Sequence, residues 1–142
     1  MREILFRGKR ISSGEWVIGG IMKTFHPNYD CKNEEDFLSQ KPNCYCICAN
    51  NKDYFVEQAS IGQYTGLTDK NGKKIFEGDL LDCEDRICVV SWHEKCGTWD
   101  CNFVRYKGKI CSNGITPVEW KYRAEVIGNI HDNPELMKGG EE

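Results

Sequence analysis

Apolar and polar residues alternate with a period of two along most of this chain, a pattern that predicts short β-strands. Paired turn residues such as Asn50-Asn51 and Lys107-Gly108 separate the alternating segments. The pattern predicts strands over residues 2–7, 15–22, 44–49, 53–57, 80–82, 86–93, 99–106, 109–111 and 124–130. Many short strands joined by turns favour a small barrel or a sandwich.

Three segments interrupt this pattern. Residues 26–43 are polar and irregular, and Asn33 is expected to cap a short helix because acidic residues follow it. Residues 135–138 predict a terminal helical turn. The pair Gly19-Gly20, inside a predicted strand, indicates a bulge or a close backbone approach.

Residues 61–81, IGQYTGLTDKNGKKIFEGDLL, have the best-specified turn chemistry in the chain. Asn71-Gly72 predicts a hairpin turn, because both residues tolerate the positive φ that such turns need. Strands rather than a helix N-terminus flank this glycine-rich stretch, so a structural turn is favoured over a phosphate-binding loop.

The order of elements from residue 77 onwards is typical of SH3-like barrels: a Gly-Asp turn, two hairpins and a final strand. The predicted fold is therefore mainly β, an SH3-like small barrel with additional N-terminal strands and a short helix or loop insertion. We expect a single domain over residues 1–142, with N-terminal strands and a variable loop over 1–60, the barrel over 61–133 and a tail over 134–142.

Charge and hydropathy exclude several classes of protein. The 142 residues carry a net charge of −3, with basic and acidic residues interspersed, so no basic footprint for nucleic acid stands out. No apolar run is long enough to span a bilayer, and the N-terminus, MREILFRGKR, lacks the apolar core of a signal peptide. The expected location is the cytoplasm.

Three pieces of the chain, taken in order, resemble the YopX family of small phage and prophage proteins. They are MREILFRGK at the start, QYTGLTDKNGKKIFEGDLL in the centre and EVIGNIHDNPELM near the end. The resemblance implies a mostly β, SH3-like fold, a phage or prophage origin and an intracellular setting in the host. The family's role is uncharacterised, so the resemblance supplies no catalytic residues.

The sequence holds nine cysteines, an odd number that cannot pair completely within one chain, so reduced thiols are expected. Two groups of them could bind zinc. The first group is Cys44, Cys46 and Cys48 on one face of a strand, with Cys31 or His26 as a fourth ligand. The second group is His93, Cys96 and Cys101, with Cys88 or Cys111 as a fourth ligand. A C-x-C strand does not aim its sulfurs at one point as a zinc knuckle does, and the second group is an ordinary hairpin loop. We therefore predict no metal and no cofactor.

Enzymatic activity is not expected, because the sequence contains no nucleophile elbow, zinc-protease motif or nucleotide-binding fingerprint. Aromatic and basic residues instead converge towards the C-terminal half. They define a predicted binding surface of Trp99, Arg105, Tyr106, Lys107, Lys109, Lys121 and Arg123.

The sequence thus favours a non-enzymatic accessory protein that binds another protein, with a homo-oligomer as one form of that binding. The first alternative is a nucleic-acid-binding protein that uses the basic and aromatic residues over 103–123. The remote alternative is a zinc-stabilised protein or a cysteine-dependent enzyme.

Overall fold

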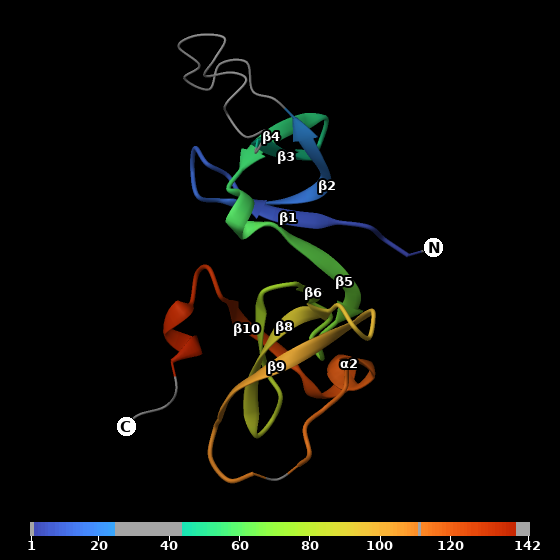
Figure 1. The fold of residues 1–142 in the computed structure, drawn as a ribbon, viewed down its shortest axis with the longest axis vertical. Coiled ribbons are helices and arrows are strands. Elements are labelled where there is room, and N and C mark those ends of the chain that lie inside the picture. Colours follow the sequence, from blue (N-terminus) through green and yellow to red (C-terminus); the bar gives the residue numbers. More distant parts are fainter. Residues whose placement is uncertain (1, 25–43, 111, 139–142) are drawn as a thin grey trace. The chain divides into compact units, whose positions relative to one another are not determined.

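The computed structural model describes residues 2–24, 44–110 and 112–138. It divides into two compact units, which we describe separately: Ile4–Gly62, and Gln63–Glu142 together with Met1–Glu3. The predicted mainly β fold is confirmed, since 51% of the described residues lie in strands (Figure 1). None of the helices in the described part of the chain is long and apolar enough to cross a membrane.

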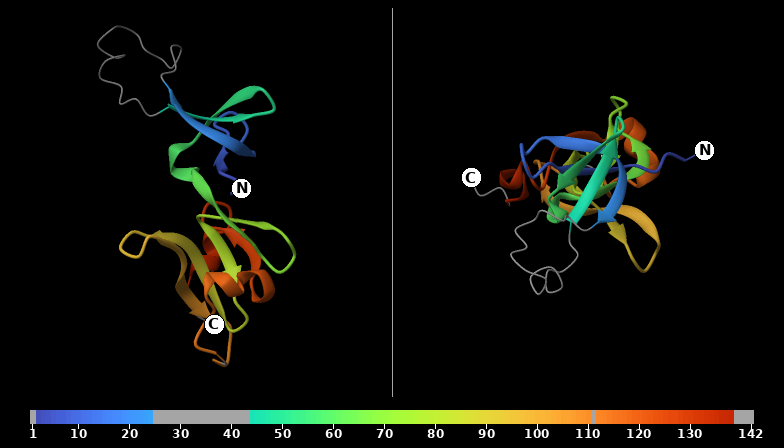
Figure 2. Two further views of the ribbon diagram at one scale, coloured as in Figure 1. Left: turned by 90° about the vertical axis from the view of Figure 1, so that its right-hand side faces the viewer. Right: turned by 90° about the horizontal axis from the view of Figure 1, so that it is seen from above.

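The unit Ile4–Gly62 is built on an antiparallel sheet with the strand order β4-β3-β2-β1 (Figure 2). Its strands are β1 (Phe6–Lys9), β2 (Trp16–Thr24), β3 (Cys44–Ala49) and β4 (Lys52–Val56), followed by a 3₁₀ turn over Gln58–Ser60. The predicted turn between β3 and β4 is confirmed, because Asn50 and Asn51 adopt φ values of 52° and 62°.

The close backbone approach predicted inside β2 occurs at Gly19. A Cβ atom at this position would lie 2.1 Å from the carbonyl oxygen of Cys48 on β3. Beside this contact, Cys46, Ile47 and Val56 are almost completely buried, at 1%, 0% and 2% exposure. The lack of a side chain at Gly19 therefore allows β2 and β3 to pack closely.

The larger unit contains a hairpin and a four-stranded antiparallel sheet. The hairpin pairs β5 (Gly62–Thr68) with β6 (Lys74–Phe76). The sheet has the order β10-β7-β8-β9, formed by β7 (Asp79–Asp82), β8 (Arg86–His93), β9 (Thr98–Tyr106) and β10 (Glu125–Asn129). A 3₁₀ turn over Pro117–Glu119 leads into the helix α2 (Trp120–Arg123), and a second 3₁₀ turn covers Pro134–Met137.

One face of this sheet covers a core that contains both apolar side chains and thiols. Trp120 of α2 is completely buried in it. The other buried members are Ile75, Leu81, Cys83, Cys88, Val90, Ile115 and Ala124, and Trp99 and Cys101 pack against them.

Two buried aspartates organise the stretch 61–81. Asp69 Oδ1 accepts hydrogen bonds from the amides of Asn71 and Lys73, and its Oδ2 accepts one from the amide of Val126 on β10. Asp79 Oδ2 accepts a hydrogen bond of 2.8 Å from the amide of Phe76. The turn framework of this stretch therefore depends on carboxylates as well as glycines.

The SH3-like barrel is not confirmed, because the described strands form open antiparallel sheets and do not close on themselves. The strand predicted over 109–111 is absent at residues 109 and 110, and Cys111 lies outside the described residues. The helix expected after Asn33 also lies outside them, and the single domain stays a prediction.

The C-terminal part contains helical structure that the alternation pattern missed. Residues 117–123 are helical because Pro117 occupies the first turn and a capping box precedes it. In this box the carboxylate of Glu119 accepts a hydrogen bond of 3.0 Å from the amide of Thr116. The terminal helical turn predicted over 135–138 is present as the 3₁₀ turn Pro134–Met137.

Candidate functional site

Strand β9 is the edge of its sheet, since it pairs with β8 and has no strand on its other side within the described residues. The amide of Cys101 donates 2.8 Å to the carboxylate of Asp100, its own neighbour, instead of to another strand. Short strands, lysines or prolines usually protect sheet edges. This edge spans nine residues, TWDCNFVRY, with neither lysine nor proline, although it carries Asp100 and Arg105 and its pairing with β8 shifts register beside Cys88.

Exposed aromatic side chains lie along β9 and the end of β8. Phe103 and Tyr106 are 54% and 41% exposed, and their ring centroids lie 4.6 Å apart. Trp92 is 41% exposed and contacts Trp99 edge-to-face, with centroids 5.1 Å apart. The edge strand therefore offers unpaired backbone together with apolar contact area.

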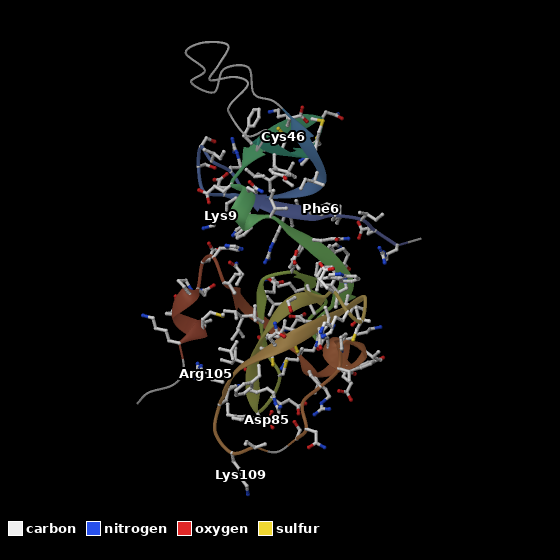
Figure 3. The ribbon with its side chains drawn as sticks, in the orientation of Figure 1. Phe6, Lys9, Cys46, Asp85, Arg105 and Lys109 are labelled. Atoms are coloured by element: carbon white, nitrogen blue, oxygen red, sulfur yellow. The ribbon has the colours of Figure 1, made fainter. Side chains whose placement is uncertain are left out.

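The predicted basic surface is interleaved with acidic side chains. Lys107 forms a salt bridge with Asp82, and Arg123 forms a bidentate salt bridge with Glu84, with hydrogen bonds of 2.7 and 2.8 Å. Lys107 and Lys109 also line a shallow cavity with Glu84 and Asp85. Asp85 and Lys109 are labelled in the lower part of Figure 3. Three of the predicted basic residues thus surround the acidic turn between β7 and β8.

The remaining members of the predicted surface have separate environments. Trp99 packs against the core of the sheet, whereas Arg105 is partly buried on β9. Lys121, on α2, lies over the ring of Tyr122 at 5.8 Å. Tyr106 stacks beneath the guanidinium of Arg86 at 5.1 Å.

The ion pairs around this turn shift three pKa values. The hydrogen bond from Arg123 lowers the pKa of Glu84, and Glu84 in turn raises the pKa of Arg123. On the other side of the turn, Arg86 donates 2.8 Å to the buried carboxylate of Asp85, which raises the pKa of the Arg86 guanidinium. Asp85 also accepts hydrogen bonds from the amide and hydroxyl of Ser112, so it anchors the loop that follows β9.

Beneath the sheet, three thiols from three segments come together. The sulfur atoms of Cys83, Cys88 and Cys101 all lie within 4.8 Å of one another. Cys83 follows β7, Cys88 lies on β8 and Cys101 lies on β9, opposite Val90. Cys83 is 0% exposed and Cys88 is 4% exposed. We call these residues the three-cysteine cluster.

Hydrogen bonds within the cluster favour one thiolate. Those from Cys101 and Cys83 lower the pKa of Cys88 to about 4, and the charge of Arg86 acts in the same direction. Hydrogen bonds with Cys101 and Cys88, together with burial, raise the pKa of Cys83. Hydrogen bonding with Cys83 lowers the pKa of Cys101, but hydrogen bonding with Cys88 and burial raise it to a net value of about 11.

The two zinc groups considered in the sequence are not gathered by the described residues. Cys46 is buried in β3 while Cys48 is exposed and lies across from Asp53. His93 accepts a hydrogen bond from the amide of Cys96 in an exposed turn. Cys101, and Cys88 as an optional fourth donor, are the members of the second group that belong to the three-cysteine cluster. The side chain of Cys44, and residues His26, Cys31 and Cys111, lie outside the described residues.

Sequence reasoning missed Cys83 and considered Cys88 only as an additional donor. The available signal was strand pairing: Leu81 lies opposite Cys88, and Val90 lies opposite Cys101. Residues on one strand alternate between the two faces of the sheet. A sequence-based prediction of this register would have placed Cys88 and Cys101 on the same face.

Comparisons with known proteins agree on the fold. The family model described as YopX protein matches residues 5–138. No curated protein matches the chain. The crystal structure of protein EF1440 from Enterococcus faecalis is similar, with a TM-score of 0.54 and 22% identity, over 97% of this chain and 100% of that one. At this identity the likeness concerns the fold alone.

Proposed function

This chain belongs to the YopX family, and on that premise we propose that it is a non-enzymatic protein-binding module. It is a phage- or prophage-encoded accessory protein that works in the cytoplasm of the host. Its partner contributes an extended segment that adds a strand to the edge of β9. A second copy of this chain is one such partner, which would make the protein a homo-oligomer.

The edge of β9 is the single observation that carries this proposal. It has one strand neighbour among the described residues, it lacks lysine and proline, and exposed Phe103 and Tyr106 accompany it. A strand added at such an edge gains main-chain hydrogen bonds, and alternate side chains then contribute specificity. On the opposite edge, the amide of Val126 on β10 binds the carboxylate of Asp69 from a distant turn, whereas the amide of Cys101 on β9 binds only the carboxylate of its own neighbour, Asp100.

The test compares two charge-introducing variants. Phe103→Lys places a charge on the edge strand, whereas Tyr122→Lys, at an aromatic residue that is 73% exposed on α2, is the matched control. We expect Tyr122→Lys to behave as the wild type and Phe103→Lys to lose the partner. Light scattering at high protein concentration measures self-association, and quantitative affinity capture from host cells measures binding of other proteins. The proposal would be refuted if the wild type, Phe103→Lys and Tyr122→Lys captured the same host proteins in equal amounts and had the same mass in light scattering.

Nucleic-acid binding over residues 103–123 remains the alternative, and the charges give it less support. Lys107 and Arg123 are paired with Asp82 and Glu84, so fewer cations are available to displace counterions from phosphate. Fluorescence anisotropy with labelled single-stranded and duplex oligonucleotides at low salt separates the two functions. Affinity that falls steeply with salt, and that Lys109→Ala weakens, would favour the alternative.

A further inference from the structure

We propose that Cys83, Cys88 and Cys101 form a zinc-binding site that supplies three thiolate ligands and leaves the fourth position open to an adjacent cavity. The site adjoins the edge of β9 that carries the proposed function, because its ligand Cys101 lies on β9 and Phe103 lines the adjacent cavity. Its ligands come from three consecutive segments of one sheet: the end of β7, then β8 and β9.

The spacing of the sulfur atoms fits a tetrahedral zinc ion. Zinc–sulfur bonds of about 2.3 Å place two ligand sulfurs about 3.8 Å apart. The three sulfurs lie within 4.8 Å of one another, so coordination requires displacements of only about 1 Å. Each thiol that coordinates releases its proton to solvent, which couples binding to pH.

The Trp120 indole is a second, independent indication of a ligand. Trp120 is 0% exposed, and its Nε1 atom has no hydrogen-bond partner among the described residues. A buried donor without an acceptor is unfavourable. Cys101 packs against the core cluster that contains Trp120. A metal-bound Cys101 thiolate would supply the negative acceptor that the buried N–H lacks.

The net charge of the site selects zinc over a monovalent soft cation. Thiolates bind both Cu(I) and Zn²⁺. Three thiolates with a divalent cation have a net charge of −1, whereas three thiolates with a monovalent cation have a net charge of −2. The divalent cation is favoured because a buried net charge is costly. Arg86, which acts electrostatically on Cys88, offsets part of what remains.

The fourth position is reached from a cavity of about 250 Å³. Cys88 and Cys101 both line this cavity, together with Arg86, Asp100 and Thr116 among others. Open coordination positions on zinc take water or an exogenous ligand. The ion would therefore be accessible from solvent on one side although Cys83 is completely buried.

The experiment is a zinc titration of the full chain under reducing conditions. Protein stripped with a chelator is titrated in competition with a chromophoric chelator, and the affinity is measured for the wild type and for serine variants. We expect one zinc per chain. Cys83→Ser, Cys88→Ser and Cys101→Ser should each weaken binding by more than the roughly 10–100-fold typical of outer-shell changes. Cys48→Ser and Cys96→Ser, at exposed thiols, are the matched controls and should bind as the wild type does.

A cobalt titration of the wild type keeps the test valid if a serine variant fails to fold. Co²⁺ bound by three thiolates gives intense sulfur-to-cobalt charge transfer and tetrahedral ligand-field bands, and zinc should abolish both. A zinc stoichiometry near zero would overturn the proposal, and so would binding that Cys48→Ser or Cys96→Ser removes. Cobalt spectra without thiolate charge transfer would overturn it as well.

Discussion

The Asp69 carboxylate shows how one buried side chain can hold distant segments together. It is 2% exposed and binds amides on both its own turn and β10, 57 positions away. In the sequence this residue looks like one of several charges in a neutral, lysine-rich stretch. Its role became visible only when the structure placed Val126 beside it.

Replacing Asp69 with alanine should destabilise the protein strongly. The change leaves three part-buried backbone N–H groups without their acceptor, and an unsatisfied donor that is fully buried costs about 1–3 kcal/mol. Because such costs are not additive, we expect a loss of about 3 kcal/mol in the free energy of unfolding, measured by urea denaturation. Asp100→Ala, at an exposed carboxylate, is the control and should change it by less than about 0.5 kcal/mol. Equal losses would contradict this role.

The pair between Glu84 and Arg123 should make a pH-dependent contribution to stability. The folded-state pKa of Glu84 lies below its unfolded value because Arg123 donates to it. The contribution is therefore complete above the unfolded pKa of about 4.3 and is lost as the pH falls through the lower folded value. Both side chains are well exposed, so the effect is small. Urea denaturation of wild type and Glu84→Gln should differ at pH 7 and converge at strongly acidic pH. A difference that grows on acidification would refute the assignment.

At the scale of elements, neighbouring glycines in β2 have opposite tolerance for a side chain. A Cβ at Gly19 would overlap the Cys48 carbonyl at 2.1 Å, whereas a Cβ at Gly20 has nothing within 4 Å. Gly19→Ala should therefore cost about 1–3 kcal/mol through overpacking, with Gly20→Ala close to neutral. Thermal or urea unfolding of the two variants measures the difference, and equal stabilities would show that β2 and β3 separate at little cost.

The sequence pattern predicted the positions of the strands better than it predicted how the strands are arranged in sheets. The strands β3 and β8 span the predicted residues, because alternation and turn residues are local signals. The helix α2 was missed, since no element was predicted between residues 111 and 124 and the capping box at Thr116 was overlooked. The barrel was inferred from the order of the elements, and order does not determine whether strands close.

The prediction of the candidate sites was limited in the same way, because the sites depend on contacts between residues that are far apart in the sequence. Of the two aromatics in the predicted surface, Tyr106 is exposed and Trp99 packs against the core, whereas exposed Phe103 and Trp92 were not among the predicted residues. The partners of Lys107 and Arg123 were not predicted, because Asp82 and Glu84 come from a hairpin more than twenty residues earlier. Likewise, Cys83 and Cys101 are separated by a whole strand, and only the register of β7, β8 and β9 brings their sulfurs together.

At the scale of the whole molecule, the cysteines have different environments in the two units. In Ile4–Gly62, Cys46 is buried and Cys48 is exposed, and no three-donor group forms among the described residues there. In the unit with Gln63–Glu142, Cys83 and Cys88 are buried beside Trp120 in the core. A ligand bound at the three-cysteine cluster should therefore stabilise one unit selectively.

Hydrogen exchange measured with and without zinc tests this selectivity. A ligand that binds only the folded state stabilises it by about 2.7 kcal/mol when its free concentration is about 100 times its dissociation constant. We expect zinc to slow amide exchange in β7, β8 and β9 by up to the corresponding factor of about 100, because those strands carry the ligands. Exchange in β2, β3 and β4 should not change, and Cys88→Ser should abolish the effect while Cys96→Ser retains it. Protection that appears equally in both units, or first in β3, would place the metal elsewhere.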